Sequence, residues 1–194
     1  MFPITVFSLP THSDTGYLQL GSFITGLTHP VLGPEHLLAM LSVGIVSARM
    51  GGNAIWGVPA TFVSVMAMGG VIGLAGFPMP WLEVGIALSV LILGVIIAMG
   101  QTLPIVITMI TVSVFATFHG YAHGAEMPIM AAPIAYIEGF MTSTVLIHLA
   151  GVLLGHLMSH LPTRLSWGKH LARLCGAGIT LCGCFFILNL IFSS

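Results

Sequence analysis

The sequence has very few charged side chains, and their scarcity excludes most classes of soluble protein. Four Lys or Arg and five Asp or Glu residues make up 5% of its 194 residues, whereas soluble domains carry roughly 25%. The net charge of −1 and the lack of a basic tract argue against a nucleic-acid partner. The chain contains no polar block of domain size, so it has no room for a soluble nucleotide-binding or catalytic domain. With 57% hydrophobic residues, the chain is predicted to be a multi-pass protein of the lipid bilayer.

Cysteine is scarce as well, which excludes a disulfide framework. Cys175, Cys182 and Cys184 all lie in the last apolar stretch. We expect them to be buried small hydrophobic residues, because free cysteine is among the most buried residue types.

Six hydrophobic units follow a short N-terminal lead, residues 1–16, which has neither a basic region nor a long enough apolar run for a signal peptide. Residues 17–194 are predicted to form a single transmembrane domain, an all-α bundle with about six crossings and short connections. The predicted units are Tyr17–Arg49, Ala54–Ala75, Trp81–Gly100, Pro104–Phe118, Ala132–His160 and His170–Phe192.

The first unit contains a polar break, HPVLGPEH, from His29 to His36. Two prolines and a glycine cannot continue a straight helix, so we predict two half-helices around an unwound centre. Imidazoles and a carboxylate within a membrane face protein or a water-filled cavity, and usually they function there. The break is therefore predicted to aim His29, Glu35 and His36 at one point, as a metal-ion or substrate site requires.

A second motif, FHGYAHGAE, runs from Phe118 to Glu126 at the end of the fourth unit. In a helix, His119 and His123 share a face and can bind one cation, and Glu126 supplies a nearby oxygen. Imidazole combined with carboxylate suits Ni, Co, Zn, Cu or Fe and fits Mg or Ca poorly.

The four basic residues predict how the chain sits in the membrane. Arg49 ends the first unit, and the other three lie in or next to the last loop: Arg164, Lys169 and Arg173. Six crossings put both places on one side, which the positive-inside rule makes cytoplasmic. Both termini are then extracytoplasmic in the cytoplasmic (inner) membrane, and both histidine motifs lie towards the outer half.

These two motifs resemble those of the HupE/UreJ family of nickel and cobalt permeases. The family motif His-Pro-x-x-Gly-x-Asp-His followed by Leu-x-Ala-Met is matched by His29 to Met40, and Phe-His-Gly-x-Ala-His-Gly-x-Glu by Phe118 to Glu126. The similarity extends over nearly the whole chain, including the segment LEVGIALSVLILG from Leu82 to Gly94. Glu35 departs from the pattern, because the family residue at this position is Asp. The extra methylene of Glu35 can change ion preference or coordination.

The resemblance implies a secondary permease, not an enzyme, that imports divalent nickel first and cobalt second without a catalytic cofactor. The metal would bind transiently to six residues: His29, Glu35, His36, His119, His123 and Glu126. Glu83 and His148 are additional pathway residues, each weighed equally against a structural role. A metallochaperone of urease or hydrogenase maturation would be a downstream partner. Which of these the metal serves, and the oligomeric state, stay open.

Other polar and sulfur-bearing residues favour structural roles. Glu138 is expected to be an interfacial acid near a helix start, and His156 and His160 to lie at headgroup level. Met127 and Met130, close to the second motif, raise the question of copper(I), but methionine is a routine packing residue in apolar bundles.

Two other function classes remain as alternatives. One is a membrane metalloenzyme, such as a di-iron hydroxylase that uses the 119/123 and 156/160 histidine pairs, although these fall on opposite membrane faces in the predicted topology. The other is a bundle that binds haem through histidines on two helices.

Overall fold

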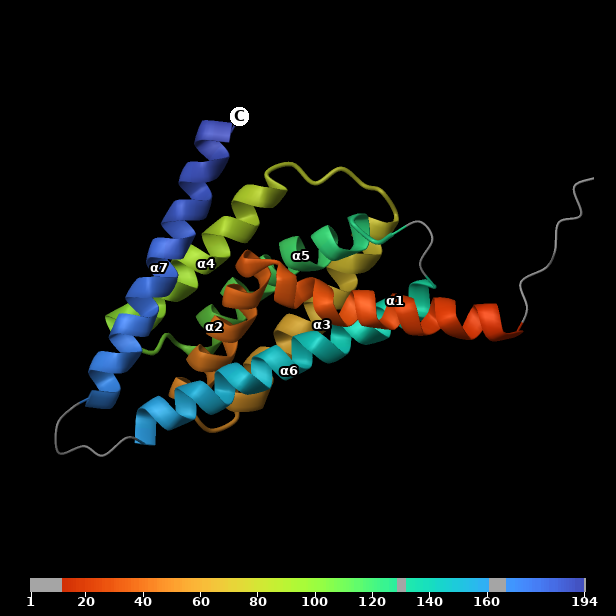
Figure 1. Cartoon of the computed structure of the whole chain (residues 1–194). Coiled ribbons are helices and arrows are strands. Elements are labelled where there is room, and N and C mark those ends of the chain that lie inside the picture. The colour runs from red at the N-terminus through yellow and green to blue at the C-terminus, as the bar shows by residue number, and fades with distance from the viewer. Residues whose placement is uncertain (1–11, 129–131, 161–166, 194) are drawn as a thin grey trace, which may run out of the picture.

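The computed structural model describes residues 12–128, 132–160 and 167–193, and within these ranges every regular element is an α-helix (Figure 1). The helices are α1 (His12–Leu32), α2 (Pro34–Met50), α3 (Ala54–Leu74), α4 (Leu82–Met99), α5 (Ile105–Ala125), α6 (Pro133–His160) and α7 (Trp167–Ser193).

Five of these helices, α3 to α7, are each long and apolar enough to cross a membrane alone. The bent pair α1 and α2 makes a sixth candidate span when its two halves are taken together. A crossing needs about 20 mainly apolar residues, and the long runs between the few charges supply them. The predicted all-α membrane bundle, with a broken first crossing, is confirmed.

The break in the first crossing is sharp and local. The axis of the first crossing bends by 78° between α1 and α2. Gly33 alone separates the two helices, and it has an extended conformation with φ −87° and ψ 102°. Pro34 follows at the start of α2, where its missing N–H breaks the helical hydrogen-bond ladder. The prediction of an unwound centre was too broad, because His29 remains in the last turn of α1.

Two helix boundaries also differ from the predicted ones. Helix α1 begins at His12, before the predicted start at Tyr17, and residues 1–11 of the predicted lead lie outside the described residues. Helix α5 runs on to Ala125, whereas the predicted unit ended at Phe118. The second histidine motif is therefore helical, because Gly120 and Gly124 are held in close helix contacts that outweigh their low helix propensity.

Helix α2 lies at the centre of the bundle, packed against α3, α4 and α6 (Figure 1). Its side chains from Ala39 to Ser47 are almost all buried. Around it, α3 pairs most extensively with α5, α4 with α7, and α1 with α6. The core also includes Phe62, Met66 and Leu93 from the surrounding helices.

Glycines bring the paired helices into backbone contact. A Cβ atom at Gly120 would collide with the carbonyl oxygen of Met66, and one at Gly124 with that of Gly70, so α3 and α5 run parallel. Gly44 and Gly151 make the equivalent contact between α2 and α6. Lipid tails supply no hydrophobic force between helices, so such close packing carries much of the association energy.

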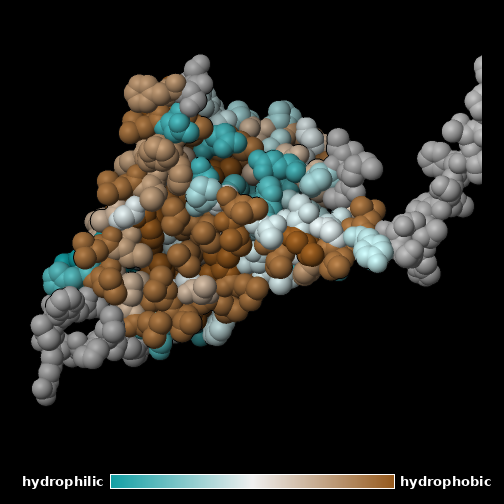
Figure 2. All heavy atoms as spheres, viewed as in Figure 1, coloured by the Kyte–Doolittle hydropathy of each residue, from teal (hydrophilic) through white to brown (hydrophobic). Residues whose placement is uncertain are grey.

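The charges of the described residues divide between the two ends of the bundle. Arg49 donates a hydrogen bond to the carbonyl oxygen of Ile97 at 2.8 Å and lies with Arg173 beside Gly100, at the end of α4. Glu83 lies at the opposite end of α4. Figure 2 shows hydrophilic side chains gathered on the upper part of the molecule, above a largely hydrophobic surface. Arg164 lies outside the described residues, and so does the side chain of Lys169.

The prediction for the cysteines was wrong. Cys182 and Cys184 are exposed on α7 and Cys175 is only half-buried. Helix α7 packs mainly on α4 and turns its remaining faces outward, where an apolar thiol suits lipid as well as it suits a core.

Two glycines of the same helix test the close-packing interpretation. Alanine at Gly176 would place its Cβ against the backbone of Ala98, whereas Gly178 has nothing within 4 Å of that position. We expect Gly176→Ala to destabilise the purified protein by about 1–3 kcal/mol, as overpacking does. Gly178→Ala should be neutral or slightly stabilising because alanine favours helix. Thermal unfolding in detergent measures both, and equal melting temperatures would contradict the interpretation.

Candidate metal site

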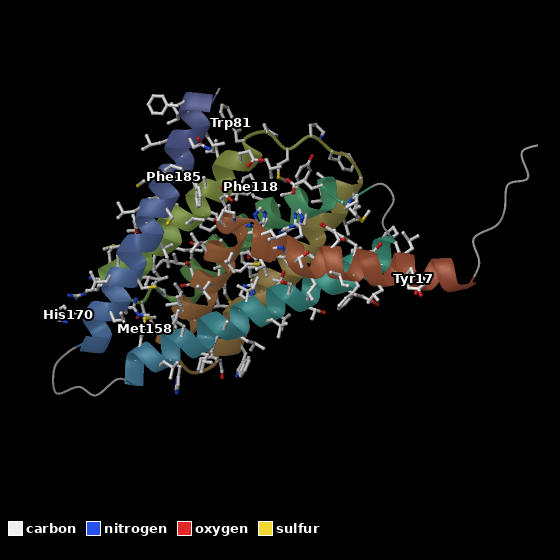
Figure 3. The ribbon with its side chains drawn as sticks, viewed as in Figure 1. Tyr17, Trp81, Phe118, Met158, His170 and Phe185 are labelled. Carbon is white, nitrogen blue, oxygen red and sulfur yellow. The ribbon has the colours of Figure 1, made fainter. Side chains whose placement is uncertain are left out.

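Four imidazole rings meet where the end of α1, the start of α2 and the last two turns of α5 converge. The His36 ring lies 4.4 Å from that of His123 and 4.7 Å from that of His119, measured between centroids. The His29 ring lies 4.9 Å from that of His123. We call these four rings the imidazole cluster. Phe118, labelled in Figure 3, precedes His119 and marks this part of the bundle.

Two local features of the sequence assemble the cluster. Four-residue spacing in α5 places His119 and His123 on one face, which is the face turned towards α2. The bend at Gly33 then brings His29 and His36 to the same ring, that of His123, from two different helices. The structure thus brings these four histidines side by side, and their role as metal ligands stays a prediction.

The cluster contains buried nitrogen atoms that have no hydrogen-bond partner among the described residues. They are Nε2 of His36, Nδ1 of His119 and both ring nitrogens of His123. The side chains of His119 and His123 are 0% and 2% exposed, so water does not readily replace the missing partners. A buried polar atom without a partner costs about 1–3 kcal/mol. Such atoms call for an explanation, and a metal ion that accepts their lone pairs supplies one.

The carboxylates stand at the edge of the cluster. Nε2 of His29 lies 3.2 Å from Oε2 of Glu126, just after the end of α5. This hydrogen bond lowers the pKa of the Glu126 carboxyl, so the group stays ionised at neutral pH. Both side chains are partly exposed, so the pair contributes at most about 1 kcal/mol to stability.

Glu35 does not join the rings as predicted. In the first turn of α2, it has no ring or ion-pair contact with the four imidazoles among the described residues. Glu35 lies close enough to Glu83 for the two carboxylates to interact electrostatically. Glu126 also interacts electrostatically with Glu83. Three carboxylates from α2, α4 and the end of α5 therefore gather around one end of the bundle.

The rings pack edge to face instead of converging on one point. The His36 and His119 rings are perpendicular, and His36 and His123 are inclined at 62°. Among the described residues, no group of three His, Cys, Asp or Glu side chains is placed to hold a metal ion. Coordination by this cluster therefore requires rotation of the imidazoles about their side-chain bonds.

A phenylalanine connects the cluster to a fifth imidazole deeper in the bundle. The ring of Phe62 lies 5.8 Å from that of His119 and 5.1 Å from that of His148. His148 is 2% exposed, donates from Nδ1 to the carbonyl oxygen of Thr144 at 2.7 Å, and leaves its buried Nε2 without a partner. Its lone pair is therefore on Nε2.

Three residues near the cluster gave no sequence signal. Oγ of Ser89 lies 2.9 Å from Nε2 of His119. Tyr136 is buried, and the centroid of its ring lies 6.2 Å from that of the His29 ring. Phe62 belongs to the core. Ser89 and Phe62 come from helices without a histidine, and Tyr136 lies outside both histidine motifs, so only the tertiary structure reveals the proximity.

The residues predicted to be structural stay apart from the cluster. His156 follows Gly155, which packs on Ile45 and Ala48 near the far end of α2 from His36. A shared di-iron site with His119 and His123 is thereby excluded for His156, and the side chain of His160 lies outside the described residues. Glu138 is exposed on α6.

One of the two methionines near the second motif lies beside the cluster. Met127 is half-buried and, with His123, lines a small apolar cavity between α3, α5 and α6. Met66 and Met141 line the same cavity. Its almost wholly apolar lining agrees with a packing role, and Met130 lies outside the described residues.

Comparison with known proteins links nearly the whole chain to one family. The family described as HupE / UreJ protein matches residues 3–186. Protein HupE of Rhizobium leguminosarum bv. viciae is 36% identical over 188 residues, which cover 96% of this chain and 95% of that protein. No solved structure matches the chain.

The unpartnered nitrogens predict that the cluster binds a divalent transition metal. His123→Ala removes the ring that touches both His29 and His36. We expect this variant to weaken Ni²⁺ binding by the purified protein by at least about tenfold, as measured by isothermal titration calorimetry. His156→Ala, at the other end of the bundle, is the matched control. An unchanged affinity in a folded His123→Ala variant would contradict a metal site in the cluster.

Proposed function

The chain belongs to the HupE/UreJ family of metal transporters, and we propose that it is a secondary permease that imports divalent nickel, with cobalt as its second substrate. The observation that carries this proposal is the imidazole cluster, in which several buried nitrogens have no partner among the described residues. In this function the metal is cargo, so it binds transiently and is released.

The chemistry of the cluster favours a borderline transition metal. Neutral imidazoles bind Ni, Co, Zn, Cu and Fe, whereas Mg and Ca prefer all-oxygen sites. Affinity alone would favour copper over nickel in such a site, so selection must come from geometry and metal supply. Packed rings that rotate to reach the ion offer a site strong enough to strip water and weak enough for release.

The three carboxylates form the mouth of the pathway in this proposal. Glu35, Glu83 and Glu126 interact electrostatically around the end of the bundle where the cluster lies. Their negative charge attracts a hydrated divalent cation and partly balances it as water is lost. In this proposal, the hydrogen bond between His29 and Glu126 breaks when both side chains bind the metal. This role includes Glu83, although it has no ion pair with an imidazole among the described residues.

The inner half of the pathway passes Phe62 and reaches His148. Phe62 contacts the rings of both His119 and His148, so it separates two groups of lone-pair donors. A buried aromatic at a constriction is a hydrophobic barrier to a hydrated ion. Movement of α2 about the bend at Gly33 would shift His36 against α5 and open the route towards His148.

The charge distribution supports the direction of transport. Arg49 and Arg173 lie together at the end of α4 opposite Glu83. Under the positive-inside rule the arginine end is cytoplasmic, which puts the carboxylate mouth and both termini on the outer side of the cytoplasmic membrane. A metallochaperone of urease or hydrogenase maturation would then receive the ion at the arginine end.

Radioactive nickel uptake into cells tests the proposed activity. Cells that produce the wild-type protein should take up nickel above the vector control, and His36→Ala should reduce that uptake at least about tenfold at matched membrane abundance. His36 touches both histidines of α5, so its loss divides the cluster.

Competition defines the substrate in the same assay. Cobalt should be the strongest competitor and magnesium should have no effect, because magnesium prefers oxygen ligands. His156→Ala should transport like wild type. No uptake above the vector control, despite confirmed membrane insertion, would contradict the permease proposal. The purified protein should then be tested for bound iron or haem.

A further inference from the structure

Ser89 of α4 makes the hydrogen bond that holds His119 from the side opposite its unpartnered nitrogen. The serine is fully buried, and its Oγ lies 2.9 Å from Nε2 of His119. The same Oγ lies 2.6 Å from the carbonyl oxygen of Ile86, one turn earlier in α4. The serine hydroxyl is thus placed between a carbonyl and an imidazole, both buried in the bundle.

The number of available protons decides the direction of both hydrogen bonds. A serine hydroxyl carries one proton, and a carbonyl oxygen can only accept. Two oxygens 2.6 Å apart need a proton between them, so Ser89 donates to Ile86. Nε2 of His119 must then carry the proton that it shares with Oγ of Ser89. In a neutral ring the lone pair is therefore on Nδ1, the buried atom that has no partner among the described residues.

We propose that Ser89 is a positioning residue that fixes His119 in the Nε2–H tautomer and keeps its Nδ1 lone pair available to the metal in the imidazole cluster. This inference rests on the proposed function for the identity of the metal, but the tautomer itself does not depend on it. Metal-binding histidines commonly donate their second ring N–H to an oxygen acceptor, which fixes both the tautomer and the ring orientation.

Ser89 differs from Ser47, another buried serine, in its hydrogen bond to an imidazole ring. Ser47 is also fully buried and donates to a carbonyl one turn earlier in its helix, that of Gly44 at 2.8 Å. Among the described residues, its hydroxyl has no hydrogen bond to a ring, and the histidine of α2 lies far from it, at position 36. Ser47→Ala therefore removes an equivalent buried hydroxyl and serves as the matched control.

Two measurements on purified full-length protein test the proposal. Nitrogen-15 NMR of histidine-labelled protein without metal reports which ring nitrogen of His119 carries the proton, with His119→Gln used for assignment. Calorimetric titration with Ni²⁺ alone reports affinity. The variants are Ser89→Ala, Ser89→Thr, which keeps the hydroxyl, and Ser47→Ala.

The expected results are specific to positioning. Wild type shows a protonated Nε2 and an unprotonated Nδ1 at His119. Ser89→Ala loses this single tautomer and weakens Ni²⁺ binding by about 10–100-fold, whereas Ser89→Thr and Ser47→Ala retain both properties. A proton on Nδ1 in wild type, or unchanged nickel affinity in Ser89→Ala, would overturn the inference. If Ser89→Ala fails to fold, the wild-type spectrum and Ser89→Thr still decide. A wild-type protein with the expected tautomer but no Ni²⁺ binding would refute the proposed function alone.

Discussion

Close contact between α3 and α5 is the constraint on which the rest of the structure depends. The motif in α5 alternates two residue types at four-residue spacing: His119 and His123 on one face, Gly120 and Gly124 on the next. The glycines let the α3 backbone approach so closely that any side chain would collide, and this approach turns the histidines towards α2. One short segment thus builds the helix interface and the imidazole cluster together, which ties the position of the rings to the packing of the bundle.

The buried imidazoles give this packing its functional meaning. A membrane interior makes an unpaired polar atom expensive, and proteins normally pair such atoms. Here several ring nitrogens have no partner in the described part of the chain, while His119 and His148 each use one nitrogen in a well-formed hydrogen bond. These two bonds leave one lone pair per ring on either side of Phe62. A series of available donors with an apolar barrier between them suits an ion that must be bound, passed on and released.

Local patterns in the sequence predicted the parts of the site that lie within one segment. The break at Gly33 and the four-residue spacing of His119 and His123 are visible in a single stretch, as are the six apolar runs. Contacts between segments were out of reach. Ser89 and Phe62 lie in helices without a histidine, and Tyr136 lies outside both histidine motifs. Glu35 was predicted to join the histidines, but it interacts electrostatically with Glu83 of α4 instead. The outward-facing cysteines were mispredicted for a related reason, because apolar residues face both core and lipid in a membrane bundle.

X-ray absorption spectroscopy can show whether the imidazole cluster ligates the transported metal. The purified protein in lipid nanodiscs, loaded with one equivalent of Ni²⁺, is measured at the nickel edge. We expect a nitrogen and oxygen shell with the multiple-scattering pattern of several imidazole rings, and loss of part of that pattern in His123→Ala. A shell of water and carboxylate oxygens without imidazole scattering, or one dominated by sulfur, would contradict it.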